Sequence, residues 1–285
     1  MVSGVVPIAQ LDAIIDGALL EDLPGGDLTS EITVDENVRA RAVAVARGPL
    51  VVCGGFVFGR VFERVDPWSR VTANVAEGAR VQPGDSLWTL EGKARALLAA
   101  ERVALNLVQR MSGIATLARA YVDALPEGSS AIIADTRKTT PGLRILERYA
   151  VRTGGARNHR NDLSSAILIK DNHIAATGSI ERAIERARER APHTTRIEVE
   201  VQSLDEFERA LEAGPDIIML DNFDVASMKE AVRRAKGRAI IEASGGVTLD
   251  RVAEIAATGI DVISVGALTH SAPAADIALD LALVG

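Results

Sequence analysis

Six short apolar segments in the second half of the chain limit the fold more than any other feature of the sequence. Each is followed directly by a charged residue or glycine, and stretches with helical periodicity separate most of them. Strands that alternate with helices form a parallel sheet covered by helices. The spacing predicts a TIM-like barrel, incomplete because only six strands are present. The segments are Ala131–Ala134, Ala166–Ile169, Arg196–Val199, Ile217–Leu220, Ala239–Ile241 and Val262–Val265.

The residues before the barrel predict a separate domain. A helix near residues 7–20 is followed by turns and short β-like segments, which indicates an α+β domain. A helix over 94–111 then reaches Gly113, which offers a break. We predict an N-terminal domain over 1–112, an open barrel over 113–270, and a C-terminal helix over 271–285 that packs back on the N-terminal domain. A doubly wound sheet is the structural alternative, but no Gly-rich dinucleotide loop follows an early strand.

Composition excludes several classes of partner. The net charge of −7 argues against non-specific nucleic-acid binding, which needs a broad basic face. No apolar run reaches the roughly 20 residues of a membrane span. Cys53 is the only cysteine, so an intrachain disulfide is impossible and a reducing compartment is expected. The sequence therefore predicts a cytoplasmic protein that binds neither nucleic acid nor membrane.

Positive charge gathers in one part of this acidic chain. Residues 135–171 contain eight Lys or Arg against four acids. Arg144, Arg148 and Arg152 have the four-residue spacing of a solvated helix face. Four of the remaining Lys or Arg and one neighbouring histidine follow strand ends or lie on loops beside them, where Arg binds carboxylates bidentately and Lys supplies a point charge. They predict a site for an anion with more than one carboxylate, and they are Arg137, Lys138, His159, Arg160 and Lys170.

Two carboxylates and two Gly-containing loops complete the predicted mouth of the barrel. Glu200 and Asp221 follow neighbouring strands, which suits a shared magnesium ion beside a phosphorylated substrate, or ion pairs with Lys170 and other basic neighbours. Ser244–Gly246 and Gly266–His270 follow the last two strands. Exposed backbone N–H groups there can bind phosphate, although one Gly pair alone is more often a tight turn.

A series of motifs in one order resembles the quinolinate phosphoribosyltransferase family over almost the whole chain. These motifs are Glu101–Arg102 with Leu105–Asn106, Asp135–Gly142, Tyr149–Arg160, Leu168–His173, Glu198–Val201, Leu220–Asn222, Ser244–Gly246 and Val265–Ser271. One departure is Ala156, where many relatives carry a third glycine. A methyl group there narrows the conformations of the loop without removing a reactive group.

The resemblance implies an N-terminal α/β sandwich domain followed by an open α/β barrel. It also implies a homodimer, or a higher oligomer built from it, with active sites at the interface. It implies transfer of phosphoribosyl from phosphoribosyl pyrophosphate to quinolinate with decarboxylation. Glu200 and Asp221 would face the ribose and its magnesium, and Lys138 or Lys170 would help to protonate the carbanion. Arg102 would reach quinolinate in the partner's site. Quinolinate would also meet Thr136, Arg137, Lys138, His159, Arg160 and Lys170, and the phosphate would meet Ser244, Gly245, Gly266 and His270.

Three other functions stay open at this point. A molybdenum-transport-associated paralogue of unknown reaction lacks much of the pattern seen here at Lys170–His173. A class I aldolase would use Lys170 or Lys138 as a Schiff base, which borohydride trapping would reveal. A biotinyl or lipoyl carrier would use the hairpin before Lys93, although Lys93 leads directly into a helix instead of standing at a hairpin tip.

Overall fold

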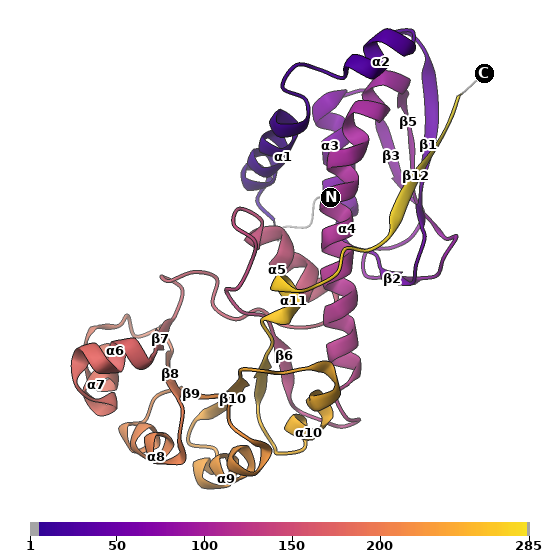
Figure 1. Cartoon of the computed structure of the whole chain (residues 1–285). Helices are drawn as coiled ribbons and strands as arrows, with labels where there is room; N and C mark the ends of the chain where they lie inside the picture. Colours follow the sequence, from indigo (N-terminus) through magenta and orange to yellow (C-terminus); the bar gives the residue numbers. More distant parts are fainter. Residues whose placement is uncertain (1–5, 284–285) are drawn as a thin grey trace. The chain divides into compact units, whose positions relative to one another are not determined.

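The computed structural model describes residues 6–283, and the chain divides into two compact units (Figure 1). The first unit comprises the described residues up to Arg119 together with 139–155 and those from 269 onward. The second comprises 120–138 and 156–268. This division differs from the predicted boundaries at 112 and 270, because 139–155 groups with the N-terminal residues. Between residues 6 and 283, no helix combines the length and hydrophobicity of a membrane span.

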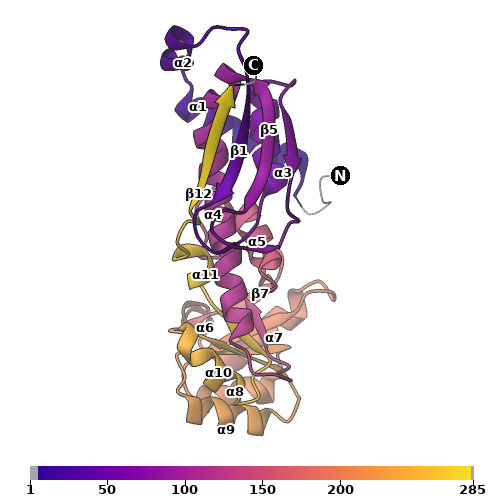
Figure 2. The same ribbon diagram turned by 90° about the vertical axis from the view of Figure 1, so that its right-hand side faces the viewer.

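The first unit contains an antiparallel sheet in the order β12-β1-β5-β3 (Figure 2). Strand β1 alternates exposed Arg39 and Arg41 with buried alanines, which gives the sheet one solvated and one buried face. Helix α3 buries Phe58 and Phe62 in this core, and the ring of Phe58 stacks on Trp88 at 4.6 Å. The elements are α1 Ile8–Asp22, α2 Leu28–Thr33, β1 Arg39–Ala46, β2 Leu50–Val51, α3 Gly55–Val65, β3 Arg70–Ala73, β4 Arg80–Val81, β5 Ser86–Lys93, α4 Ala94–Asp123, α5 Arg144–Thr153, α11 Ala267–His270 and β12 Ile277–Leu283.

The predicted C-terminal helix over 271–285 is wrong within the described residues. Ile277–Leu283 forms strand β12, which pairs antiparallel with β1 from Ala46↔Ile277 to Ala40↔Leu283. Alanine and leucine favour helix locally, but the unpaired edge of β1 offers seven residues of backbone pairing. The segment does return to the N-terminal residues, as a strand and not as a helix.

Gly113 does not end a helix as predicted. Helix α4 runs through it without interruption, and the glycine instead permits a close approach of the chain. A Cβ atom at this position would lie 1.9 Å from the carbonyl oxygen of Pro273, which is backbone and cannot rotate away. The absence of a side chain at Gly113 therefore lets residues 273–274 pass against α4.

We expect Gly113→Ala to lower the free energy of unfolding by about 1–3 kcal/mol, as overpacking does. Gly17→Ala is the matched control, because Gly17 is also helical and a Cβ there meets nothing within 4 Å. It should raise the free energy of unfolding by about 0.5–1 kcal/mol through helix propensity. Urea unfolding of both variants measures the difference, and stabilisation by Gly113→Ala would contradict the close approach.

Helix α5 belongs to the first unit through a buried ion pair. Glu147 is 1% exposed in its side chain and accepts hydrogen bonds from Arg110 on α4 and from the backbone N–H of Thr140. Arg110 also donates to the carbonyl of Thr269. Arg148 is buried as well, so the predicted solvated face over Arg144, Arg148 and Arg152 is wrong at its central residue.

The second unit confirms the incomplete barrel. Its six parallel strands follow the order β6-β11-β10-β9-β8-β7, and helices separate most of them. The segment Arg157–Arg160 extends one edge, since Arg157 forms a parallel bridge with Ala134. The elements are β6 Ile132–Ala134, β7 Ile167–Ile169, α6 Asp171–Thr177, α7 Ile180–Arg190, β8 Ile197–Val201, α8 Leu204–Ala213, β9 Ile217–Asp221, α9 Val225–Ala235, β10 Ile240–Ser244, η1 Leu249–Arg251, α10 Val252–Ala256 and β11 Val262–Ser264.

Candidate functional site

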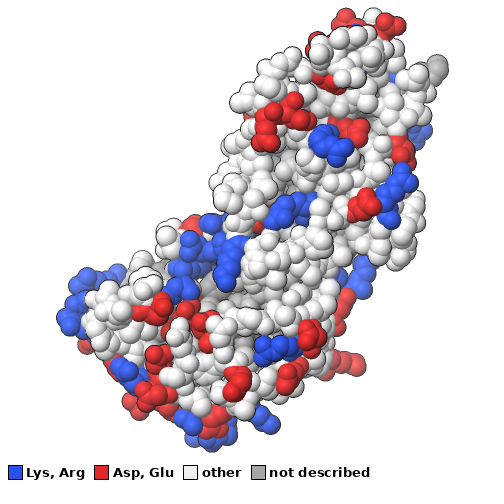
Figure 3. Space-filling model, viewed as in Figure 1, with Lys and Arg blue, Asp and Glu red and all other residues white. Residues whose placement is uncertain are grey.

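The carboxyl ends of the barrel strands surround a cavity of about 630 Å³ within the second unit. Four basic and two acidic side chains line it, an excess of two positive charges in a chain whose net charge is −7. Figure 3 shows basic side chains beside acidic ones over the strand ends of this unit. The lining residues are Thr136, Arg137, Lys138, His159, Arg160, Leu168, Lys170, Glu200, Met219, Asp221, Asn222, Ser244, Gly245, Gly246 and Ser264.

Arg137 and Arg160 hold two guanidinium groups near each other. Burial lowers the pKa of Arg160, and the charge of Arg137 lowers it further. Arg160 also donates to the carbonyl of Ala166 at 3.3 Å, which holds the guanidinium at this edge of the barrel. Like charges placed together in this way favour a bound anion, because its charge relieves their repulsion.

Buried Asp135 builds the loop that carries Arg160. Its carboxylate accepts the backbone N–H of His159 at 2.7 Å and the side-chain amide of Asn158 at 2.6 Å. The loop is thereby fixed to the end of β6. This explains why the sequence places an acid before the basic pair Arg137 and Lys138.

Lys170 and Glu200 form an ion pair in the cavity, from the ends of β7 and β8. The pair agrees with one of the two expectations for Glu200. The next helix, α6, starts at Asp171, and His173 accepts the backbone N–H of Lys170 at 2.9 Å. His173 therefore caps the helix start and fixes the backbone of Lys170, which accounts for its place in the motif.

The loop after β10 needs glycine where it passes the end of β9. Gly245 has a φ of 89°, and a Cβ there would lie 2.3 Å from Oδ1 of Asn222. Asn222 itself has a φ of 57°, and its N–H donates to the carbonyl of Ser244 at 2.9 Å. Gly245 and Gly246 thus leave the backbone open at the cavity wall, as a phosphate site requires.

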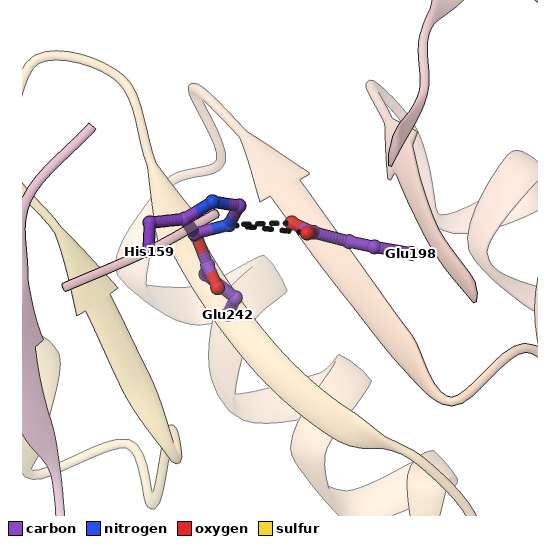
Figure 4. Close-up of side chains that lie close together, drawn as sticks. All are labelled: His159, Glu198 and Glu242. Atoms are coloured by element: carbon purple, nitrogen blue, oxygen red, sulfur yellow. Dashed lines mark hydrogen bonds and ion pairs between the residues drawn. The ribbon is translucent and has the colours of Figure 1, made fainter. Parts of the chain in front are cut away.

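Below the cavity, three titratable side chains form a buried cluster (Figure 4). Nε2 of His159 lies 3.1 Å from Glu198 and 3.5 Å from Glu242. Ser264 is hydrogen-bonded to Glu242. Burial raises the pKa of Glu242 to about 7, and the neighbouring charge of Glu198 acts in the same direction.

Two sets of residues have donors for a cation. Glu200 and Asp221 present carboxylate oxygens in the open cavity, which fits magnesium bound by one or two carboxylates together with substrate phosphates. His159, Glu198 and Glu242 place ligand atoms within 4.8 Å of one another. In the second set a hydrogen bond already joins His159 to Glu198, and the carboxylates are at most 3% exposed. The first set is therefore the better magnesium site.

The cavity brings together most of the predicted site residues. Gly266 follows β11 but does not line the cavity, and Arg102 and His270 belong to the first unit. Sequence reasoning missed Leu168, Met219, Asn222 and Ser264 as lining residues, and Glu198 and Glu242 below them. The missing signal was the two-residue alternation of strands: Glu198 precedes Glu200 by two positions and Glu242 precedes Ser244 by two, so both share the inward face.

Comparison with known proteins gives one consistent result. The family description "Quinolinate phosphoribosyl transferase, N-terminal domain" matches residues 27–112, and the description of the C-terminal domain matches residues 114–280. These two matches meet at Gly113, where the sequence placed its boundary.

Individual relatives cover nearly the full chain. "Nicotinate-nucleotide pyrophosphorylase [carboxylating]" of Mycobacterium leprae is 47% identical over 271 residues, which are 93% of this chain and 94% of that protein. The probable enzyme of the same name from Bacillus subtilis is 42% identical, covering 96% and 94% of the two chains. The crystal structure of NadC from Streptococcus pyogenes is 40% identical and superposes with a TM-score of 0.95, covering 99% of this chain and 100% of that one.

Proposed function

The chain belongs to the quinolinate phosphoribosyl transferase family, and we propose that its barrel transfers phosphoribosyl from phosphoribosyl pyrophosphate to quinolinate with decarboxylation. The products are nicotinate mononucleotide, pyrophosphate and carbon dioxide. The observation that carries this proposal is the excess of two positive charges in the cavity of an acidic protein. A dicarboxylate matches that excess. The two acidic lining residues follow strands that lie away from Arg137 in the order of the sheet.

The transfer step needs stabilisation of positive charge on the sugar. The bond from ribose C1 to pyrophosphate breaks with oxocarbenium character, and the pyridine nitrogen forms the new bond to C1. We assign Glu200 and Asp221 to the ribose, where fixed carboxylates stabilise the developing charge. Magnesium, when bound, would neutralise negative charge on the pyrophosphate oxygens. The same two carboxylates would hold the ion.

Decarboxylation follows transfer, because the quaternary nitrogen then stabilises the carbanion left at C2. The C2–carboxylate bond breaks, its electron pair stays on C2, and a proton adds there. Lys138 lines the cavity on the side of Arg137, where the carboxylates of quinolinate are proposed to bind, and Lys170 forms an ion pair with Glu200. We therefore assign the proton-donating role to Lys138 and the positioning of Glu200 to Lys170.

We expect quinolinate to be preferred over nicotinate by about a hundredfold or more in kcat/KM, since a monoacid leaves cationic groups without their anion. Parallel assays with each acid and phosphoribosyl pyrophosphate, following nucleotide and carbon dioxide, test this. Comparable kcat/KM values for the two acids would refute the assigned substrate. A borohydride-trapped adduct with a carbonyl compound at Lys170 or Lys138 would favour the aldolase instead.

We further propose that the protein works in the cytoplasm as a homodimer. In this dimer, Arg102 completes the active site of the partner subunit. Arg102 is exposed on α4, and within the described residues no hydrogen bond or ion pair engages its guanidinium. The alternative of a helix-surface ion pair with Glu101 therefore lacks support. An exposed arginine whose guanidinium has no partner among residues 6–283 suits a carboxylate ligand supplied by another molecule.

A further inference from the structure

The cluster below the cavity has a geometry that the transfer chemistry does not require. Glu198 and Glu242 come from β8 and β10 and are 3% and 2% exposed. Strand β9 between them contributes Met219, which pairs with Glu242 in the sheet register. Two carboxylates buried beneath a site for anions would oppose substrate binding if both were charged, so their presence needs a cause.

His159 connects this cluster to the cavity through both of its ring nitrogens. Nδ1 accepts the backbone N–H of Arg160 at 2.7 Å, and Nε2 faces Glu198 at 3.1 Å. A nitrogen that accepts a hydrogen bond carries no proton, so the proton of the ring is on Nε2, where Glu198 accepts it. Both nitrogens therefore have partners within the chain, and the ring also lies at the wall of the cavity.

We propose that Glu198 and Glu242 are positioning residues that act through His159 to fix Arg160 at the carboxylate-binding side of the cavity. By accepting a hydrogen bond from Nε2, Glu198 selects the His159 tautomer that leaves Nδ1 without a proton. Nδ1 can then accept the backbone N–H of Arg160 and hold that backbone in place. Glu242 supports the arrangement from the other side and is itself held by Ser264. This role rests on the proposed function only in naming quinolinate as the anion.

The charge of the cluster follows from its neighbours. The groups facing Glu242 are Glu198 from β8, His159 from the loop after α5 and Ser264 from β11. Burial and the charge of Glu198 keep Glu242 protonated below its pKa of about 7. Burial lowers the pKa of His159, but the hydrogen bond and charge of Glu198 raise it overall, while the N–H of Arg160 opposes protonation at Nδ1. Ionisation of Glu242 adds a negative charge to the cluster beneath the anion site.

Three variants test the proposal, with KM and kcat measured separately for both substrates. Glu198→Leu removes the acceptor for Nε2 and should raise the KM for quinolinate by roughly ten- to a hundredfold, while the KM for phosphoribosyl pyrophosphate changes less than about threefold. Glu198→Gln keeps a carbonyl acceptor and should recover most of that loss. A general loss of packing would instead raise the KM for both substrates. Thermal unfolding identifies a variant that does not fold.

Glu242→Gln provides the pH readout, because it resembles the protonated form. In the unmodified protein, the KM for quinolinate should rise about tenfold between pH 6.5 and 8.5 as Glu242 ionises. In the Gln variant this rise should be absent, and titration of the substrates themselves cancels in the comparison. The proposal would be overturned if the unmodified protein and Glu242→Gln had identical pH profiles and Glu198→Leu left the KM for quinolinate unchanged. Absence of quinolinate turnover in the unmodified protein would instead reject the proposed function.

Discussion

Replacing Glu200 or Asp221 with Ala is expected to lower kcat by about a hundred- to a thousandfold, the usual cost of removing one fixed electrostatic partner of a transition state. Both side chains line the cavity, and Glu200 is only 10% exposed. Quinolinate binding should weaken far less, because removal of a carboxylate leaves the cavity more positive for an anion. The loss should therefore appear in kcat and not in the affinity for quinolinate.

Steady-state assays and calorimetric titration of quinolinate separate the two effects. Glu200→Gln tests charge at nearly constant shape, and it should lose almost as much kcat as the Ala variant. The control is Glu212→Ala, since Glu212 is an exposed acid on the outer helix α8. A loss of quinolinate affinity as large as the loss of kcat would place Glu200 and Asp221 beside the acid and not beside the ribose.

The residues at strand ends were predictable because the carboxyl ends of parallel strands lie at the same edge of the sheet. Once apolar runs alternate with helices, the polar residue after each run must meet the others, whatever the details of packing. Lys170, Glu200 and Asp221 were found in this way, and the cavity brings them together. The incomplete barrel followed from the same count of strands.

The elements that sequence reasoning missed depend on partners far away in the chain. The residues of β12 favour a helix locally, and only the free edge of β1, more than 200 residues earlier, makes them a strand. Glycine often marks a helix break, but Gly113 lies within a helix. Glycine is needed there because the backbone of Pro273 passes close to it. Glu198 lies inside an apolar run and Glu242 directly follows one, and their hydrogen bonds to His159 and Ser264 cannot be read from neighbouring residues.

Arg102→Ala and Lys138→Ala should each remove nearly all turnover, yet a mixture of the two chains should recover it. The reason is that Arg102 is proposed to complete the partner's site, while Lys138 lines the cavity of its own chain. In a mixed dimer both defects then fall in one site, and the other site has an intact Arg102 and an intact Lys138. Random exchange makes half of the dimers mixed, so about a quarter of the unmodified activity should return.

The measurement requires proof that subunits exchange, which differently tagged chains provide by co-purification after mixing. Arg102→Lys is the matched variant, since it keeps the charge but loses the bidentate geometry, and it should recover only part of the activity without mixing. If Arg102 served its own chain, every mixed dimer would contain two defective sites and no activity would return. If Arg102 were an ordinary surface residue, worth at most about 1 kcal/mol in an ion pair, Arg102→Ala alone would remain active. The three outcomes are distinct, because only action across the interface combines two inactive chains into an active one.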